Sequence, residues 1–472
     1  MQKKTKIVAT IGPASAAPET ISELLRAGAN AFRLNFSHGT HKDHQHLADA
    51  IREAEQQSGL AAALIADVSG PKIRVGELQD GKIVLQNGQD ITLTAEPIVG
   101  TAQKISVTMP EIIQHATEGE KLLLDDGTKE LAVKNKTENE LVCAVVAGGE
   151  LLAHKGINVP DMDLGVAAFT DKDREDLAFA LTLGIRFVAV SFVERQEDIA
   201  AVRNFLREHH AEHVNIIAKI ERKRALDNVD GIIAASDAVM VARGDLGVEI
   251  PFDEVPAHQK EIINKANAAS KTVIVATQML ESMTDHERPT RAEVTDVYNA
   301  VLDGADAVML SEETAMGKYP VAAVQAMAEI AQQAEKQYAA LPLKDDFMIM
   351  SDDPEDVLSL NTCMIAERAG ACAIIALTAS GRTARMMSRH KPHQAIIALS
   401  PNADAIESLR ISWGVEAYAF PEMPENVEQA IAAAKTFVQK NTLCAAGDPV
   451  IITGGIPLTF RGVTNIVSVQ RV

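Results

Sequence analysis

The sequence predicts an α/β protein: a (β/α)8 TIM barrel with an inserted small antiparallel β-barrel lid and a C-terminal α/β domain. Three observations predict this. Eight short apolar runs alternate with helical segments, a block of alternating apolar and polar residues follows the third run, and a second α/β pattern follows the eighth. Near-continuous Val, Ile and Ala runs are typical of parallel strands buried on both faces. An open doubly wound sheet is the alternative.

The eight apolar runs each end in polar or charged residues, which is how strands of such a barrel meet its rim. Most are separated by segments with the length and periodicity of a helix. They are KIVATIG from Lys6, AFRLNFS from Ala31, ALIADVS from Ala63, FVAVSFV from Phe187, NIIAKIE from Asn215, AVMVARGD from Ala238, TVIVATQ from Thr272 and AVMLSEE from Ala307.

The insertion between the third and fourth runs alternates apolar and polar residues across Gly, Asn and Asp turns, which predicts antiparallel strands. Because it leaves and re-enters the barrel at one loop, we expect it above the carboxyl rim of the strands. After the barrel, a long helix and a linker lead to the last domain. The predicted domains are 1–69 and 169–343 for the barrel, 70–168 for the lid and 344–472 for the C-terminal domain.

Composition limits the partners and the compartment. A net charge of -20 would repel a phosphate backbone, so we expect no nucleic acid, and no apolar run is long enough for a membrane span. The N-terminus enters a strand pattern without a signal peptide. Four cysteines at irregular spacings predict neither disulfides nor a metal site. A reducing, cytoplasmic location fits these features.

Charged and hydroxyl side chains follow the strand runs, where the carboxyl ends of barrel strands gather catalytic groups. Taken singly, each is a solvated residue or a surface ion pair. As a set on one rim, with both signs of charge, they indicate a site. They are Arg33, Asn35, Ser37, Asp67, Lys219, Glu221, Arg243, Asp245, Thr277, Ser311 and Glu313.

Two carboxylates from different strands, Glu221 and Asp245, suit a hard divalent cation that keeps water and substrate oxygens in its shell. Arg33, Arg74 and Lys219 supply cations around that ion, as phosphoryl transfer requires, with Lys219 beside an enolate oxygen.

The turn at Gly244 and Asp245 leads into a helix and can hold a carboxylate through free backbone N–H groups. An aldolase or lyase using a Lys219 Schiff base or a Glu221/Asp245 metal is the enzymatic alternative, although a carboxylate two residues from the lysine disfavours a neutral amine. A catalytically inactive metabolite sensor is the alternative outside enzymes.

Nine segments resemble the successive motifs of the pyruvate kinase family, in family order. The resemblance implies transfer of the phosphoryl group of phosphoenolpyruvate to ADP, giving ATP and pyruvate in glycolysis, with Mg²⁺ or Mn²⁺. The segments are TKIVATIGPAS, FRLNFSHG, GPKIRVG, KGINVP, IIAKIERKRALDN, VMVARGDLGVEIP, VATQMLESM, RPTRAEVTDV and DGADAVMLSEETAMGKYP.

The resemblance also implies roles for individual residues. Arg33 contacts the phosphoryl group, Lys219 stabilises the enolate, and Thr277 and Ser311 lie on a water-mediated proton route. Gly244, Asp245 and Thr277 hold the substrate carboxylate, and Glu221 and Asp245 bind Mg²⁺. The implied nucleotide-binding residues are Pro13, Asn35, Phe36, Ser37, His38, Arg74 and Lys155.

Family members bind a monovalent cation as well, and the matching ligands here are Asn35, Ser37, Asp67 and the carbonyl of Val68. Potassium-dependent members carry Glu where this sequence has Lys72. We expect the lysine ammonium to reach Asp67 and replace the ion, so potassium is not required. Many members have a small residue at the position of Glu312, and the sequence does not explain the glutamate found here.

The last domain resembles the effector domain of the family, and LTASGRTARMMSR resembles its phosphate loop. Hydroxyls, a glycine and a cation at a strand-to-helix turn can bind a phosphate. A simple N-capped turn without a ligand would have the same sequence pattern. A phosphorylated allosteric effector and a homotetramer are the further expectations. The implied effector residues are Thr378, Ser380, Gly381, Arg382 and Thr383.

Overall fold

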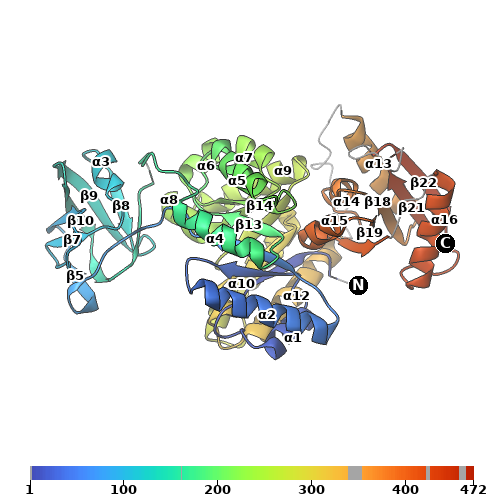
Figure 1. Cartoon of the computed structure of the whole chain (residues 1–472), viewed down its shortest axis with the longest axis horizontal. Helices are drawn as coiled ribbons and strands as arrows, with labels where there is room; N and C mark the ends of the chain where they lie inside the picture. Colours follow the sequence, from blue (N-terminus) through green and yellow to red (C-terminus); the bar gives the residue numbers. More distant parts are fainter. Residues whose placement is uncertain (1–2, 161, 339–352, 421–425, 456–463) are drawn as a thin grey trace.

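The computed structural model describes residues 3–160, 162–338, 353–420, 426–455 and 464–472. Three sheet-containing units lie along its long axis, with the barrel between the inserted domain and the C-terminal domain (Figure 1). The predicted linker and the predicted boundary at 343/344 lie outside the described residues. Within them, no helix is both long and apolar enough to cross a membrane.

The barrel is closed by eight parallel strands in the order β1-β17-β16-β15-β14-β13-β3-β2, which confirms the predicted fold class. All eight apolar runs of the sequence form these strands, whose residues are almost entirely buried. The strands are β1 (Lys6–Thr10), β2 (Ala31–Asn35), β3 (Ala63–Val68), β13 (Phe187–Val190), β14 (Asn215–Ile220), β15 (Ala238–Ala242), β16 (Thr272–Ala276) and β17 (Ala307–Leu310).

Helices cover the outside of the barrel and bury their apolar faces against the strands in one large core. Local signals set several boundaries: Thr40, Thr170 and Thr290 each form a capping box with an acidic residue three positions on. The helices are α1 (Pro18–Ala27), α2 (His41–Ser58), α4 (Asp171–Thr182), α5 (Gln196–Glu208), α6 (Lys223–Asp227), α7 (Val229–Ala235), α8 (Arg243–Glu249), α9 (Val255–Ala268), α10 (Arg291–Asp303), α11 (Glu312–Ala315) and α12 (Pro320–Tyr338).

The inserted domain is a small, mostly antiparallel β-structure with its own core. Its seven-stranded sheet runs β4-β12-β8-β9-β10-β6-β7, and β5 pairs with β11. A bridge between Val75 and Val107 joins the two edges, so the sheet closes on itself as expected for a small barrel. The elements are β4 (Ile73–Arg74), β5 (Lys82–Leu85), β6 (Asp90–Thr94), β7 (Lys104–Ser106), α3 (Glu111–His115), β8 (Lys121–Leu124), β9 (Lys129–Lys136), β10 (Glu140–Ala147), β11 (Gly149–Leu152) and β12 (Gly156–Asn158).

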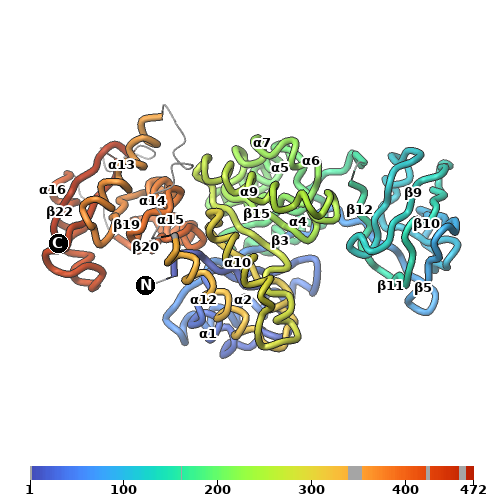
Figure 2. The backbone as a smooth tube through the Cα atoms, turned by 180° about the vertical axis from the view of Figure 1, so that it is seen from behind, coloured from blue at the N-terminus to red at the C-terminus, as the bar shows by residue number. Residues whose placement is uncertain are grey.

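The C-terminal domain is a five-stranded sheet in the order β20-β19-β18-β21-β22, parallel except for the last pair. Its helices α14 and α15 face the barrel in both views (Figures 1 and 2). The elements are α13 (Pro354–Arg368), β18 (Ala373–Leu377), α14 (Arg382–Ser388), β19 (Ala395–Ser400), α15 (Ala403–Ser408), β20 (Val415–Ala419), α16 (Val427–Lys440), β21 (Pro449–Gly454) and β22 (Ile466–Arg471).

This domain packs on the floor of the barrel, where the strands begin. Ile411 is fully buried and belongs to the apolar cluster inside the barrel. Lys391 and Asp306 form a buried ion pair of 2.6 Å across the same boundary. The carboxyl rim of the barrel therefore faces the inserted domain, and the opposite end is sealed by the C-terminal domain.

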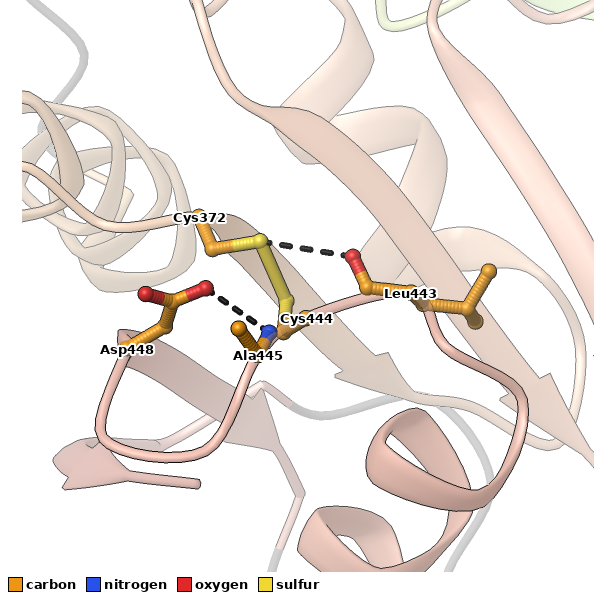
Figure 3. The surroundings of a disulfide bond; sticks show 5 residues. All are labelled: Cys372, Leu443, Cys444, Ala445 and Asp448. Atoms are coloured by element: carbon orange, nitrogen blue, oxygen red, sulfur yellow. Dashed lines mark hydrogen bonds between the residues drawn. A yellow bond between two sulfur atoms is a disulfide. The ribbon is translucent and has the colours of Figure 1, made fainter.

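Two cysteines correct the expectation drawn from their spacing. Cys372, just before β18, and Cys444, in the loop before β21, form a disulfide with a Cα–Cα distance of 6.1 Å (Figure 3). The adjacent turn is held by the Ala445 amide, which donates to Asp448 at 2.8 Å. The parallel pairing of β18 with β21 brings the two together across 72 residues of sequence, so spacing carried no signal. Cys143 and Cys363 are free and buried.

Candidate active site

The carboxylate of Asp67, at the end of β3, joins two cations at the rim of the barrel. Arg33 Nε donates to its Oδ2 at 2.6 Å, and Lys219 Nζ donates to its Oδ1 at 3.2 Å. Burial raises the pKa of this carboxyl, but Arg33 and Lys219 outweigh burial and hold the pKa below its usual value. Asp67 is therefore a buried anion that fixes two cations side by side.

Lys219 has two further partners. Its Nζ lies 2.8 Å from Glu221 Oε1 and donates to Ser191 Oγ at 2.8 Å. Burial lowers the pKa of Lys219, whereas Asp67 and Glu221 raise it by more, so the pKa lies above its ordinary value. The amine stays protonated, which opposes the Schiff-base chemistry of the aldolase alternative.

Glu221 and Asp245 follow adjacent strands, β14 and β15, and interact electrostatically. Glu221 Oε2 accepts from the Phe192 amide at 2.8 Å. Burial raises the pKa of Glu221, Lys219 opposes this, and the charge of Asp245 raises it further. A divalent cation would relieve the repulsion between the two carboxylates.

These residues fit Mg²⁺ shared with a substrate. In the described ranges, no group of three or more His, Cys, Asp or Glu side chains forms a metal cage. Mg²⁺ is commonly bound by one or two carboxylates plus substrate oxygens, and Mn²⁺ accepts the same oxygen ligands. The two carboxylates meet that requirement.

The turn after β15 and the end of β16 form a single hydrogen-bonded unit. The Gly244 amide donates to Thr277 Oγ1 at 2.7 Å, and that hydroxyl donates to the Ala276 carbonyl at 2.6 Å. Thr277 has a φ of 68°, a strained conformation for a β-branched residue. Arg243 maintains it by donating to the Thr277 carbonyl at 2.7 Å while pairing with Asp296 at 2.7 Å.

Ser311 follows β17 on the same rim. Its amide donates to Glu313 Oε2 at 2.7 Å. Its Oγ is buried, and no hydrogen-bond partner is recorded for it within the described part of the chain. A buried hydroxyl of this kind is commonly satisfied by water or a ligand.

The segment from Asn35 to His38 is held as a tight turn after β2. The Phe36 amide donates to the Asp67 carbonyl at 2.9 Å, and the Ser37 amide donates to Asn35 Oδ1 at 3.2 Å. The Phe36 ring is buried and stacks on His44 at 4.0 Å, while His44 Nε2 lies 3.0 Å from the His38 carbonyl oxygen. Because its ring is buried, Phe36 can contact a ligand only through its backbone. The side chain of His38 is exposed.

Two predicted nucleotide-binding cations lie on the inserted domain. Arg74 donates to the His154 carbonyl at 3.0 Å, and Lys155 pairs with Asp125 at 2.8 Å. Pro13, predicted near the base, is exposed in the loop after β1. Arg74 and Lys155 are therefore both held by contacts within the lid.

Electrostatics nevertheless connect the lid to the rim. Burial lowers the pKa of His38, and Arg74, Lys72 and Arg33 lower it further, with Glu312 opposing. Glu312 also acts on Lys155, whose pKa is raised chiefly by its hydrogen bond to Asp125. The charge of Glu312 thus acts on His38 at the rim and on Lys155 on the lid. This electrostatic role was not predicted from the sequence.

The predicted monovalent-cation ligands gather at the ends of β2 and β3, and the ligand oxygens of Asn35, Asp67 and Val68 are already hydrogen-bonded. Asn35 Oδ1 accepts from Ser37, and the Val68 carbonyl accepts from Ser191 Oγ at 2.8 Å. Asp67 is balanced by Arg33 and Lys219, and no bond between Lys72 and Asp67 is recorded among the described residues. Lys72 contributes to the field at His38 instead.

The predicted effector residues lie in the turn before α14 (Thr378, Ser380 and Gly381) and at its first two positions (Arg382 and Thr383). Thr378 Oγ1 accepts from the Gly381 amide at 3.0 Å, and Gly381 has a φ of 80°, which glycine tolerates. Arg382 donates to Glu355 at 2.9 and 3.0 Å, and Thr383 Oγ1 lies 2.9 Å from Thr464 Oγ1. Ser380 lies beside them, so the structure brings this set together.

Sequence reasoning missed two hydroxyls of the rim network. Ser191 bonds to Lys219, and Thr10 Oγ1 accepts from Arg33 Nη1 at 3.2 Å while donating to the Leu310 carbonyl at 2.9 Å. Thr10 ends β1 and Ser191 directly follows β13, so their position at a strand end was the available signal.

Comparisons with known proteins match one family over nearly the whole chain. The family model described as "Pyruvate kinase, barrel domain" matches residues 2–324, and "Pyruvate kinase, alpha/beta domain" matches residues 356–470. The chain belongs to the pyruvate kinase family. The pyruvate kinase of Geobacillus stearothermophilus is 42% identical over 476 residues, covering 100% of this chain and 80% of the relative. That of Clostridium perfringens is 39% identical over 481 residues, with full coverage of both.

Solved structures show the same relationship. A crystal structure of a pyruvate kinase from Cryptosporidium parvum matches with a TM-score of 0.92 and 35% identity, covering 100% of this chain and 96% of that one. Phosphotransferase activity is the function of the pyruvate kinase family, and its members generally use a divalent metal ion. The predicted family, fold and enzyme class are confirmed.

Proposed function

We propose that this chain moves the phosphoryl group of phosphoenolpyruvate to ADP in glycolysis, and the Asp67 network is the observation that carries the proposal. Arg33 binds the transferring phosphoryl group, and Lys219 faces the enolate oxygen that leaves it. Both cations are held by one buried carboxylate, so they need no reorganisation when charge develops in the transition state.

Glu221 and Asp245 would hold Mg²⁺ or Mn²⁺ together with substrate oxygens. When bound, such an ion neutralises charge on the phosphoryl group and the enolate oxygen. Glu221→Gln and Asp245→Asn should each raise the Mg²⁺ concentration needed for half-maximal activity, because each removes a charged oxygen. Asp253→Asn, which changes an exposed carboxylate nearby, is the control. An unchanged Mg²⁺ requirement in both variants would place the ion elsewhere.

The substrate carboxylate would bind at the Gly244–Thr277 unit. A carboxylate can replace Thr277 Oγ1 as acceptor of the Gly244 amide, with the Asp245 amide beside it, and the freed threonine hydroxyl can then donate to it. The unsatisfied Ser311 hydroxyl supports a water-mediated proton route with Thr277 to the enolpyruvate carbon.

ADP would lie between the rim and the lid. The turn from Asn35 to His38 contributes polar backbone and side chains, Pro13 lies near the base, and Arg74 and Lys155 approach the phosphates from the lid. The combined effect of Arg74, Lys72 and Arg33 on the pKa of His38 supports a positive field there. His38 positions the nucleotide instead of acting as a base.

The remaining features of the proposal come from the family resemblance. They are a cytoplasmic homotetramer, a phosphorylated effector at the turn from Thr378 to Thr383, and the domain division 1–69 with 169–343, 70–168 and 344–472. The effector proposal predicts that Arg382→Ala abolishes activation but leaves activity at saturating phosphoenolpyruvate unchanged.

A coupled assay that follows pyruvate formation from phosphoenolpyruvate and ADP with Mg²⁺ tests the reaction. Activity that requires all three components supports the proposal. Full binding of phosphoenolpyruvate without any turnover would favour the inactive sensor instead.

A further inference from the structure

Phe192, in the loop after β13, has a backbone conformation that is uncommon for an aromatic residue. Its φ is 57°, in the left-handed region, which is unfavourable for bulky side chains and persists only where the surrounding structure holds it. Such residues cluster at functional sites. The preceding residue already belongs to the rim network, because the hydroxyl of Ser191 accepts from Lys219 at 2.8 Å. The contacts of Phe192 therefore bear on the site.

The backbone amide of Phe192 is directed at the carboxylate of Glu221. It donates to Oε2 at 2.8 Å, while Oε1 lies 2.8 Å from Lys219 Nζ. No other donor to Oε2 is recorded within the described part of the chain. Because Glu221 is only 1% exposed, bulk solvent does not replace this donor. The orientation of the carboxylate thus depends on the peptide between Ser191 and Phe192.

The ring of Phe192 has two close neighbours. One is Gly70, where the chain leaves β3 for the inserted domain. A β-carbon added to Gly70 would lie 2.8 Å from Phe192 Cδ2 and 3.1 Å from the carbonyl oxygen of Ser191. The other neighbour is the guanidinium of Arg222, which lies over the ring at 5.7 Å from its centroid, within the range of a cation–π contact. Together they restrict the ring and the peptide that precedes it.

Arg222 is 8% exposed and is itself fixed by two carboxylates. Its Nε donates to Glu194 Oε1 at 3.2 Å, and its Nη1 donates to Glu249 Oε1 at 3.4 Å. Glu249 also accepts from Asn158 Nδ2 at 3.2 Å, which connects this arginine to β12 of the inserted domain. Arg222 directly follows Glu221, so the carboxylate and the guanidinium come from one short segment.

Both connections between the barrel and the inserted domain reach this ring. A cavity of about 20 Å³ is lined by Phe192 and Arg222, by Pro71 on the outgoing connection and by residues 163–166 on the returning one. It has room for about one water molecule and is too small for a substrate. These residues therefore act by packing on one another, where small changes in volume are transmitted to neighbouring groups.

We propose that Phe192 is a positioning residue for the divalent cation: its ring, packed against Gly70 and Arg222, holds the peptide whose amide orients Glu221. This inference rests on the proposed function, in which Glu221 is a ligand of Mg²⁺. Groups that hydrogen-bond to a metal ligand fix its orientation, and their loss typically costs ~10–100-fold in metal affinity. The contact with Gly70 extends this dependence to the segment that leads into the inserted domain.

Titration of the full chain with Mn²⁺ tests the proposal without turnover, because electron paramagnetic resonance detects the free ion. Phosphoenolpyruvate is present and ADP is absent. Phe192→Ala should weaken Mn²⁺ binding by about tenfold, because the amide loses its support. Phe192→Tyr keeps the ring and should bind Mn²⁺ normally. Phe437→Ala, which removes a half-buried ring from α16, is the control, and thermal unfolding shows that each variant is folded.

A variant that adds an atom gives an independent test. Gly70→Ala places a methyl group against the Phe192 ring and the Ser191 carbonyl, and should also weaken Mn²⁺ binding. Gly59→Ala introduces a similar backbone strain, because φ is 69° there and 63° at Gly70, but its methyl group would meet no atom within 4 Å. It should bind Mn²⁺ normally. The pair separates pressure on the peptide from backbone strain.

A double-mutant cycle tests whether Phe192 acts through Glu221. In the Glu221→Gln background, Phe192→Ala should have little further effect on Mn²⁺ binding, because the ligand that it positions is already impaired. In the Asp245→Asn background, Phe192→Ala should keep its roughly tenfold effect. A general loss of structure would weaken binding equally in both backgrounds.

Two results would overturn the proposal: unchanged Mn²⁺ binding in both Phe192→Ala and Gly70→Ala, or an equal effect of Phe192→Ala in the two backgrounds. In either case Glu221→Gln would still weaken Mn²⁺ binding if the proposed function holds. If Glu221→Gln itself leaves Mn²⁺ binding unchanged, the metal site of the proposed function is wrong, and the positioning role is overturned with it. The two failures are therefore distinguishable.

Discussion

At the scale of single residues, the buried charge of Lys219 is held by ion pairs with two carboxylates, Asp67 and Glu221. Lys219→Met should lower turnover by about 10²–10³-fold or more, because the charge acts mainly in the transition state, while the KM for phosphoenolpyruvate changes little. Steady-state kinetics checks this, with Lys265→Met on the surface of α9 as control. Near-normal turnover would remove Lys219 from its role.

The family resemblance implies that potassium-dependent members carry an acidic residue where this chain has Lys72, a fixed positive charge. We expect substantial activity with Mg²⁺ as the sole metal ion and tetramethylammonium as the monovalent cation, too large for the Asp67 region. Lys72→Glu should lose that activity and regain part of it with potassium, because it replaces a positive with a negative charge. Initial rates with and without potassium measure both effects.

Lys82→Glu makes the same charge change on an exposed lid lysine and should leave the potassium response unchanged. If the unmutated protein is nearly inactive without potassium, the charge-replacement argument is wrong. Asn35, Ser37, Asp67 and Val68 would then form a working ion site.

At the scale of elements, His390 follows α14 and packs against α13 through a 2.9 Å contact between Nε2 and Ser359 Oγ. Burial, with Arg389 and Lys391, lowers the pKa of His390 from 6.5 to about 3. The unfolded chain therefore binds the proton first, so stability is present above pH 6.5 and is lost as pH falls toward 3. Between pH 7.5 and 5 this loss is about 2 kcal/mol.

Urea unfolding at the two pH values checks this prediction. His390→Gln keeps a donor for Ser359 but cannot titrate, so it should lose about 2 kcal/mol less than the unmutated chain over the same interval. Since the other histidines titrate in both proteins, their effect cancels in the difference. Equal losses would mean that His390 is not held neutral.

At the scale of the whole molecule, the barrel and the C-terminal domain share a buried ion pair. The side chains of Lys391 and Asp306 are 1% and 5% exposed, and Asp306 also accepts from the Trp413 and Val273 amides. Asp306→Ala should destabilise the fold by about 3–5 kcal/mol, because it leaves a lysine buried without a counter-charge. Urea unfolding followed by the fluorescence of Trp413, the single tryptophan, measures this loss.

Two further variants distinguish the cost of an unpaired buried lysine from the cost of removing any carboxylate. Asp230→Ala removes an exposed partner of Lys265 and should cost less than about 1 kcal/mol. Adding Lys391→Met to Asp306→Ala removes the buried charge and should recover part of the stability. No recovery would attribute the loss to the backbone bonds of Asp306 alone.

The sequence by itself determined the barrel, the lid and most of the rim. Parallel strands that are buried on both faces need runs of apolar residues, and the polar groups of a barrel site follow at the carboxyl ends of those runs. Arg33, Lys219 and Glu221 could therefore be predicted as site residues from their positions in the sequence. The order of the family motifs added the reaction. These signals are local, because each one lies within a single segment of the sequence.

Only the tertiary structure decided which groups meet. It paired Asp67 with Arg33 and Lys219, where the sequence had suggested Lys72, and it joined Cys372 to Cys444 across a parallel strand pair. Contacts between distant segments depend on the packing of whole domains, and no local periodicity or spacing encodes them.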